Sequence, residues 1–275
     1  MSSWYSEQPP QRPPDAPPPK PSGSNVKKAL GPLAVLGVLL AKFKGLLIPI
    51  VKFFPVILKT GGTMFLSIGA YAILWGWKFA VGFVVLIFVH ECGHLLAAKR
   101  IGLKVGAPVF IPFMGAIIAL KEAPRNVWIE SQVGIGGPLL GTIGAAISLG
   151  IALLTGNGLF AAIAYSGLFL NLFNLAPIGF LDGGRVVTAL SPWLWLVGAV
   201  IVALMMITHF NFILLLIFLM SLPRLFSLFR PRMAEEQRYF EVTPAQRWLM
   251  AALYFGLIIF LTLGMKFIEL LLKPE

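Results

Sequence analysis

The chain is poor in charged residues, which make up only 12% of its 275 residues, against about 25% in a typical soluble domain. Hydrophobic residues make up 58%, and the mean hydropathy is +0.87. The scarcity of charge excludes an ordinary soluble domain. The long apolar runs indicate instead a protein whose main solvent is a lipid bilayer.

Cysteine and acidic residues are also scarce. Cys92 is the only cysteine, so no disulfide can form within the chain, and 11 acidic residues stand against 22 basic ones. The basic residues lie beside apolar runs and are not interleaved with aromatic residues that could stack on bases, so we expect no nucleic-acid partner. Residues 1–25 lack an apolar core, so we expect no cleavable signal peptide.

Composition divides the chain into five segments. Residues 1–25 contain eight prolines and predict a disordered tail, and residues 26–60 predict basic amphipathic helices on the membrane surface. Residues 61–222 form the predicted membrane core, 223–246 a cytoplasmic connection, and 247–275 a last transmembrane helix with its tail. If the spans alternate, all but three of the 22 basic residues fall on the side of the N-terminus, which we therefore expect in the cytoplasm.

The apolar runs predict an all-α polytopic membrane protein with about six to seven transmembrane helices. Two spans fit between residues 61 and 98, joined near Trp75 to Lys78. The others are expected at 133–155, 159–179, 187–207 and 247–268, with 210–222 doubtful. Residues 107–121 contain two short apolar runs separated by Met114-Gly115, which predict a short membrane-associated β-hairpin.

The strongest chemical signal is the run HECGH, from His90 to His94, within an otherwise apolar span. On a helix, residues four apart share one face, so both imidazoles can reach one metal ion. Glu91 can then stand beside a metal-bound water as the general base, because zinc lowers the pKa of that water to about 7. A polar helix end near the interface is the plain alternative, but ionisable residues inside a membrane helix usually serve a function.

A catalytic zinc site usually has three protein ligands, so two histidines are not enough. His209 lies in an expected interfacial turn and is a weak candidate for the third ligand. Asp182 is a better one, because Pro177, Gly179 and the glycine pair that follows Asp182 can bend the chain near its carboxylate. A simple turn aspartate at the membrane interface would explain the same residues equally well.

The pairing of HECGH with NLAPIGFLDGGR resembles the site-2 protease family of intramembrane zinc metalloproteases. The resemblance covers about residues 62–190, includes Gly136-Gly137-Pro138, and is closest to compact members without a PDZ domain. It implies that His90, His94 and Asp182 ligate one zinc ion and that Glu91 is catalytic. Where the family pattern often has asparagine, three residues after that proline, this chain has Gly141.

Asn171 and Asn174 lie on the segment that leads to Asp182. Either amide could contact the substrate or stabilise an oxyanion, and either could equally join two helices; the family motif favours Asn174. Cys92 is rotated about 200° from His90 on a helix, so we expect it to serve packing.

The resulting hypothesis is an intramembrane zinc metalloprotease that hydrolyses peptide bonds within or near the bilayer. Its partners would be the lipid bilayer and membrane-protein substrates with a transmembrane segment, and the hairpin could hold an unwound substrate as an added strand. The alternative is a catalytically silent membrane scaffold or binding protein that keeps the same fold. The intact set of Glu91 and three candidate ligands favours the enzyme, and the lack of an internal repeat disfavours a transporter.

Overall fold

The computed structural model describes residues 60–113, 115–119, 121–231 and 233–272. The expected tail 1–25 and the expected surface segment 26–60, apart from its last residue, lie outside these ranges. The described elements are a helix Thr60–Trp75, α2 Trp77–Arg100, β1 Val109–Ile111, β2 Gly115–Ile117, α3 Val127–Thr155, α4 Gly158–Asn174, α5 Asp182–Leu190, α6 Leu194–Thr208, α7 Phe212–Leu228, α8 Ala234–Tyr239 and α9 Pro244–Leu271.

The prediction of a mostly helical protein with one small hairpin is confirmed. Three of the described helices, α2, α3 and α9, are long and apolar enough to cross a membrane. The helix Thr60–Trp75 and helices α4, α6 and α7 are apolar but shorter. The count of six to seven spans therefore stays a prediction.

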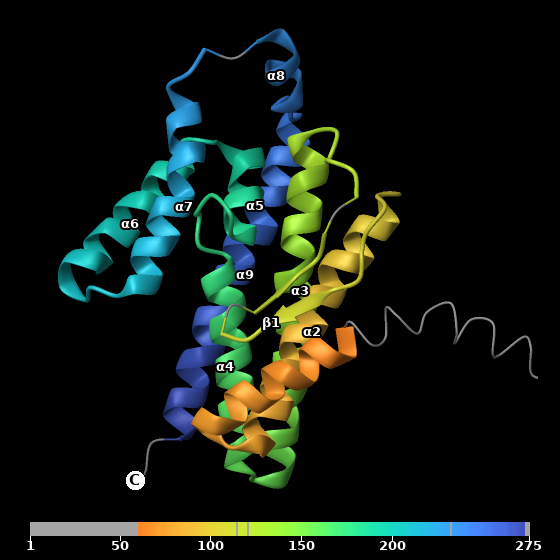
Figure 1. The fold of residues 1–275 in the computed structure, drawn as a ribbon, viewed down its shortest axis with the longest axis vertical. Coiled ribbons are helices and arrows are strands. Elements are labelled where there is room, and N and C mark those ends of the chain that lie inside the picture. Colours follow the sequence, from red (N-terminus) through yellow and green to blue (C-terminus); the bar gives the residue numbers. More distant parts are fainter. Residues whose placement is uncertain (1–59, 114, 120, 232, 273–275) are drawn as a thin grey trace, which may run out of the picture. The chain divides into compact units, whose positions relative to one another are not determined.

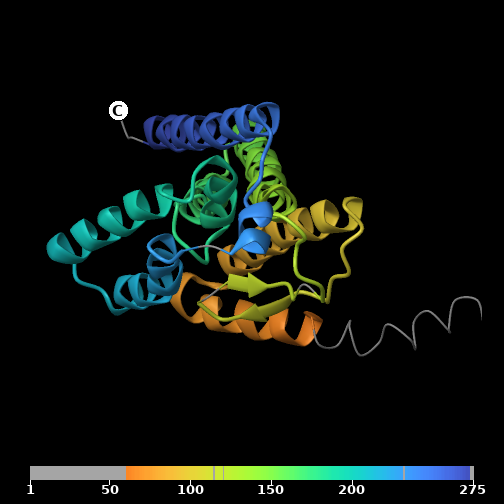
Figure 2. The same cartoon turned by 90° about the horizontal axis from the view of Figure 1, so that it is seen from above.

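Helices α2, α3, α4 and α9 lie side by side, and α6 and α7 project to one side of them in both views (Figures 1 and 2). Helix α3 packs against α2, α4 and α5, and α9 packs against α4 and α5. The largest buried cluster joins α3, α4, α5 and α9, with Leu168, Val186 and Leu261 almost fully buried in it. Short α5 is therefore enclosed by longer helices on several sides.

Local sequence signals explain where the long helices begin and end. Helix α3 begins after Asn126, whose side chain accepts a hydrogen bond from the Ile129 amide, and it ends at Gly156, which has a φ of 65°. Helix α9 begins with a capping box between Thr243 and Gln246. Gly76, with a φ of 79°, separates the first described helix from α2, at the junction that the sequence predicts.

The structure differs from the expected spans at two places. The expected span 187–207 is divided into α5 and α6, because the helix stops at Ser191 and restarts after Pro192. Helix α7 continues through Pro223 to Leu228, so it extends into the segment expected to be a polar connection.

The hairpin is confirmed within residues 107–121. Its strands are antiparallel and pair Val109 with Ile117, Phe110 with Ala116 and Ile111 with Gly115. Phe110 is buried in a cluster with Tyr71, Ala80, Val84 and Ile87, and Figure 2 shows the two strands between the first described helix and α2. The hairpin therefore lies along α2 one turn before His90.

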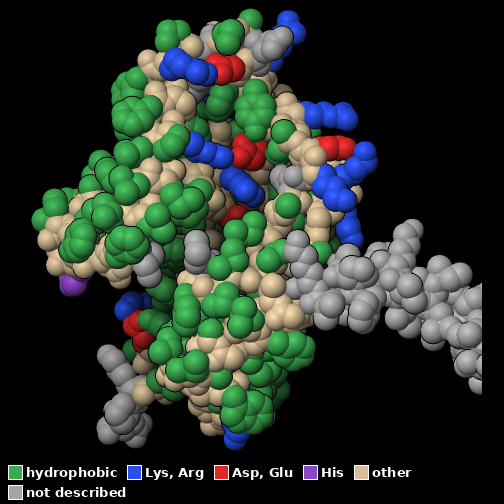
Figure 3. Space-filling view, in the orientation of Figure 1, with side chains coloured by type: hydrophobic (Ala, Val, Ile, Leu, Met, Phe, Trp, Pro, Cys, Tyr) green, Lys and Arg blue, Asp and Glu red, His purple; other side chains and the backbone are tan. Residues whose placement is uncertain are grey.

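Charged side chains are distributed unevenly over the surface. They gather around α8 and the neighbouring ends of α3 and α7, whereas the opposite part of this face is largely hydrophobic (Figure 3). Lys99 and Arg100 end α2 at the charged end, and Lys78 lies at the start of the same helix. A mostly apolar body with charge gathered towards one end suits a protein that crosses a bilayer.

Candidate metal centre

His90 and His94 lie on consecutive turns of α2, and both are buried in spite of their polarity. Their exposed fractions are 3% and 8%, and their Nε2 atoms lie 3.2 Å apart. The spacing of four residues gives this arrangement directly, because one helical turn stacks the two side chains on one face. Both rings therefore face one point, and their role as metal ligands stays a prediction.

Asp182 reaches the same point from the first turn of α5, far along the chain. Its Oδ2 atom lies 3.1 Å from Nε2 of His90 and 3.1 Å from Nε2 of His94, and the residue is only 8% exposed. Position at the N-terminus of a helix also favours a carboxylate. The simple turn aspartate at an interface, the plain alternative from the sequence, does not describe this buried side chain.

Hydrogen bonds to the Nδ1 atoms of the two histidines determine which ring nitrogens are free to bind a metal ion. Nδ1 of His94 lies 2.8 Å from the Val133 carbonyl oxygen, which can only accept, so this Nδ1 carries a proton. Nδ1 of His90 lies 2.8 Å from Oδ1 of Asn171, another acceptor. In the neutral rings both Nε2 atoms therefore present lone pairs towards Asp182.

These atoms fit a single metal ion. Ligand atoms bound about 2.0–2.1 Å from a tetrahedral zinc ion lie about 3.3–3.4 Å from one another, close to the separations of 3.1–3.2 Å found here. Two nitrogen lone pairs and a carboxylate oxygen at such distances repel unless a cation lies among them. The donor set of two imidazoles and one carboxylate is one that zinc accepts in catalytic sites.

Glu91 lies between the two histidines in the HECGH run, and it is 6% exposed. Its carboxylate lies with the ligand atoms of His90 and His94 within 4.8 Å of one another. Asp182 is closer to both rings, so it makes the tighter triangle with them. Among the described residues, no group forms a hydrogen bond with the Glu91 carboxylate, so its oxygens remain available to take up a proton.

Glycines allow α2 and α3 to approach closely beside this site. A Cβ atom at Gly93 would overlap the Gly136 carbonyl, and a Cβ atom at Gly137 would overlap the ring of His94. The Gly136-Gly137 pair therefore gives room both for the opposing backbone and for a candidate ligand. This close approach also brings the Val133 carbonyl within reach of His94.

The segment that carries Asp182 is held by side chains from the C-terminal helices. The Tyr254 hydroxyl of α9 donates to the Leu175 carbonyl at 2.7 Å, and the Trp195 indole of α6 donates to the Gly184 carbonyl at 2.9 Å. Between Leu175 and Gly184 in the chain, Gly179 packs against the Arg224 side chain of α7. Asp182 therefore depends on contacts that are distant in the sequence.

Arg224 is itself fixed by two partners. Its Nη2 atom lies 3.1 Å from Oε1 of Glu130 on α3, and its guanidinium lies over the Trp195 ring at 5.3 Å. The Tyr239 hydroxyl donates to the other Glu130 oxygen at 2.8 Å. Burial, followed by the Glu130 charge, raises the pKa of Tyr239 above its ordinary value, so the hydroxyl keeps its proton.

Sequence reasoning missed these supporting residues. Tyr254 and Trp195 lie in apolar helices with no motif around them, and only the fold shows their hydrogen bonds. Arg224 carries a usable signal, because a charged residue within an apolar helix usually has a buried partner. Interpreting residues from 223 onward as a polar connection hides that signal.

The remaining candidates have different surroundings. Asn174 is half-buried, and its Nδ2 atom donates to the Leu170 carbonyl of its own helix at 3.1 Å. Asn171 contacts His90, and a substrate contact for either amide stays a prediction. His209 lies at the exposed end of α6 and is not among the side chains that converge on the site.

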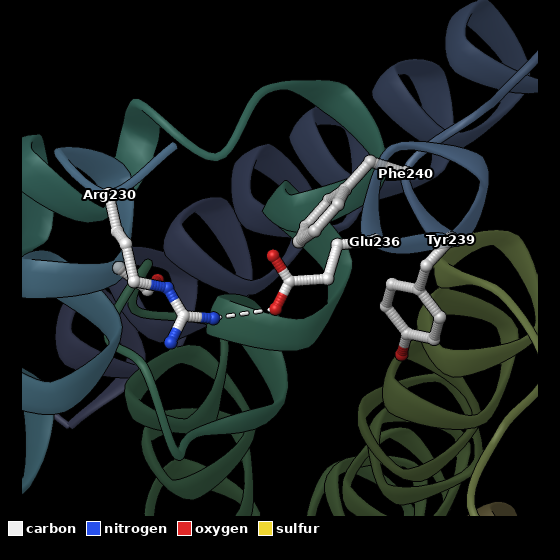
Figure 4. Close-up of a pocket in the computed structure, with 5 residues that line it drawn as sticks. Arg230, Glu236, Tyr239 and Phe240 are labelled. Atoms are coloured by element: carbon white, nitrogen blue, oxygen red, sulfur yellow. Dashed lines mark hydrogen bonds and ion pairs between the residues drawn. The ribbon is translucent and has the colours of Figure 1, made fainter. Parts of the chain in front are cut away.

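A separate cavity lies away from the metal centre. It has a volume of about 220 Å³ and is lined by Ser227 of α7, Arg230 of the connection after α7, Glu236 and Tyr239 of α8, and Phe240 after α8. Figure 4 shows the ion pair that links Arg230 to Glu236 beside it, at 2.6 Å. None of the three candidate ligands lines this cavity, so we do not assign it to the same site.

Comparison with known proteins finds relatives that are named zinc metalloproteases. Residues 78–165 match the family model described as Peptidase family M50. Zinc metalloprotease MJ0392 of Methanocaldococcus jannaschii is 32% identical over 135 residues, which are 46% of this chain and 37% of that protein. Putative zinc metalloprotease Rip3 of Mycobacterium tuberculosis is 28% identical over 142 residues (47% and 35%). Probable zinc metalloprotease EGY2, chloroplastic, of Arabidopsis thaliana is 29% identical over 153 residues (40% and 27%).

The matches therefore span only about a quarter to two-fifths of the length of these relatives. The family match covers α2, the hairpin, α3 and part of α4, and Asp182 lies beyond it. The family match includes the HECGH run and the glycine pair that makes room for His94. Residues 78–165 of the chain are therefore similar to Peptidase family M50, and the relatives matched over less than half of the chain are named zinc metalloproteases.

Proposed function

We propose that the protein is an intramembrane zinc metalloprotease that hydrolyses peptide bonds of membrane-protein substrates within or near the bilayer. The observation that carries the proposal is the buried triangle of two imidazole nitrogens and one carboxylate oxygen, with Glu91 beside it. Three ligands and an adjacent acid are the parts that a hydrolytic zinc site needs. The relatives named zinc metalloprotease support the same activity.

His90 Nε2, His94 Nε2 and Asp182 Oδ2 would hold the metal ion. When bound, zinc supplies Lewis-acid chemistry, which makes a scissile carbonyl more electrophilic and a water molecule more acidic. Glu91 takes the proton from the attacking water and later passes it to the leaving amine. Because Glu91 directly follows His90, it lies beside the proposed ligands, but it is farther from the two histidine rings than Asp182 is.

The hairpin supports the proposed handling of substrate. The Phe110 amide donates to Thr63 Oγ1, so it faces away from β2, and Phe110 and Ala116 form a pair without ladder hydrogen bonds. The Ala116 amide then faces the outer edge of β2. We propose that an unwound substrate segment pairs with this edge, because a helix must open before its peptide bonds can be cut.

An apolar cavity suits the proposed class of substrate. It lies between α2 and α4, has a volume of about 380 Å³, and is lined mainly by aromatic side chains, including Phe83 and Phe169. Phe83 precedes His90 by about two turns of α2. Such a surface suits apolar side chains of a membrane segment better than it suits a charged peptide.

The test is metal analysis combined with cleavage of a membrane-protein substrate by purified protein and by Glu91→Gln. We expect about one zinc ion per chain in both proteins and a loss of cleavage of about 10²-fold or more in the variant, the scale of general-base catalysis. A wild-type protein that binds zinc and cleaves no tested substrate, with Glu91→Gln indistinguishable from it, would favour the silent scaffold.

A further inference from the structure

One side chain outside the proposed ligand set contacts a candidate ligand directly. Asn171 of α4 is 1% exposed, and its Oδ1 atom lies 2.8 Å from Nδ1 of His90 on α2. Its Nδ2 atom donates to the Gly167 carbonyl at 2.7 Å. Both polar groups of the amide are therefore engaged within the protein.

The bond to Gly167 determines how the amide is oriented. A carbonyl oxygen accepts only, so the group that faces it must be the amide nitrogen, and the group that faces His90 must be the oxygen. An oxygen acceptor requires a proton on Nδ1 of His90. The Nε2 atom is then left with the lone pair that a metal ion needs.

Gly141 of α3 is the residue that makes this position possible. A Cβ atom at Gly141 would overlap the Oδ1 atom of Asn171. Gly150 on the same helix has no atom of the described residues within 4 Å of its Cβ position, so these residues do not require glycine there for space. The Asn171 side chain thus occupies the space that a side chain at position 141 would take.

The two histidines are supported in different ways. His94 is oriented by the Val133 carbonyl, which belongs to the backbone of α3 and cannot be removed by a substitution. His90 is oriented by the Asn171 side chain. A change at position 171 should therefore release one ring and leave the other in place.

We propose that Asn171 is a positioning residue that, seated over Gly141, holds the His90 ring with its Nε2 atom directed at the metal ion. This inference rests on the metal centre of the proposed function and adds a role that differs from a substrate contact. Outer partners of metal-binding histidines fix both the tautomer and the ring orientation. Their loss typically weakens metal binding about 10- to 100-fold.

The first test compares Asn171→Ala with Asn174→Ala in the full-length chain, purified in detergent. Zinc affinity is measured by competition with a chelator, and thermal unfolding checks that each variant is folded. Asn174 lies on the same helix, and within the described part of the chain its side chain donates to the Leu170 carbonyl of that helix, so it is a matched control for the zinc measurement. We expect about 10- to 100-fold weaker zinc binding in Asn171→Ala and wild-type binding in Asn174→Ala.

A spectroscopic measurement separates positioning from a general loss of stability. At saturating cobalt(II), the visible spectrum reports the coordination geometry of the bound ion. We expect a changed spectrum in Asn171→Ala, because the His90 ring is free to turn, and a wild-type spectrum in Asn174→Ala. Weaker binding with an unchanged spectrum would assign Asn171 to packing and overturn the proposal.

The second test uses Gly141→Ala, which removes no polar atom, with Gly150→Ala as its matched control. We expect Gly141→Ala to weaken zinc binding and Gly150→Ala to leave it unchanged. In the Asn171→Ala background, Gly141→Ala should cost nothing further, because its effect runs through the amide. Additive losses in the double variant would contradict the inference.

Failure of this inference is distinguishable from failure of the proposed function. If the wild type binds zinc and cleaves substrate while folded Asn171→Ala binds zinc equally well, the positioning role is wrong and the protease assignment stands. If the wild type binds no zinc, both are wrong. The zinc affinity of either Asn171→Ala or Gly141→Ala, whichever remains folded, is sufficient to decide whether the positioning role is correct.

Discussion

The two parts of the candidate metal centre, here called its arms, are built in contrasting ways. His90 and His94 stand on a regular helix of 24 residues, and the helical repeat alone places them on one face. Asp182 begins a helix of nine residues; the irregular segment before it is held by Tyr254 and Arg224, and the first turn of the helix by Trp195. The two histidines form the helical arm, which is determined locally. Asp182 and the segment before it form the tertiary arm, which depends on three helices that follow it in the chain.

This contrast indicates what the C-terminal helices contribute. Helices α6, α7 and α9 lie outside the family match, and none of them carries one of the three proposed ligands His90, His94 and Asp182. Their contacts nevertheless fix the start of α5 and therefore the Asp182 carboxylate. Substitutions in these helices should weaken the site by small steps, and substitutions at the ligands should abolish it.

The largest effect is expected on the helical arm. His90→Ala and His94→Ala each remove a proposed ligand, so zinc affinity should fall by more than about 100-fold, beyond the loss expected for an outer partner. Cleavage should fall to background. Zinc content after dialysis and a cleavage assay measure both quantities, and stoichiometric zinc in either folded variant would remove that histidine from the ligand set.

An intermediate effect is expected at the hairpin, which belongs to neither arm. Ala116→Pro removes the amide proposed to pair with substrate, so kcat/KM should fall by about 5- to 10-fold, the worth of one hydrogen bond, while zinc content stays normal. Ala116→Val keeps the amide and serves as the control. Ile117→Pro is a less specific test, because Ile117 pairs with Val109 within the hairpin.

Unchanged kcat/KM in a folded Ala116→Pro variant would argue that substrate does not use this edge. Lost zinc in the same variant would show that the hairpin supports the metal centre after all. Either result would change the division of the molecule into two arms and a separate substrate edge.

The smallest effect is expected on the tertiary arm. Tyr254→Phe removes only the hydroxyl that donates to the Leu175 carbonyl, and one such bond contributes about 1 kcal/mol. Zinc affinity should therefore fall by at most about fivefold. Tyr165→Phe is the matched control, because its hydroxyl bonds Glu269 and not the segment before Asp182. Equal zinc affinities in the two variants would mean that Tyr254 does not position Asp182.

The helical arm could be predicted from the sequence because its information is local. A spacing of four residues specifies one face of a helix, and ionisable residues within an apolar run usually serve a function. The hairpin was predictable for a similar reason, since short apolar runs around Gly115 leave little room for a helix. The junction at Gly76 followed from an interfacial cluster of aromatic and basic residues.

The tertiary arm could be predicted only in part. Asp182 is a candidate through its motif, but nothing near it in the sequence indicates Tyr254, 79 residues beyond Leu175. The split between α5 and α6 was not predicted because apolar residues continue across Pro192. For Asn171 the sequence leaves open a substrate contact or a bond between helices, and its contact with His90 emerges only when α2 and α4 are packed together.

The most direct test of the account is the zinc content of Asp182→Ala beside that of the wild type. The wild type should retain about one zinc ion per chain, and Asp182→Ala should lose both zinc and cleavage, because two imidazoles alone do not complete the site. Full zinc occupancy with normal cleavage in Asp182→Ala would contradict the account. The third ligand would then have to be sought elsewhere, beginning with His209.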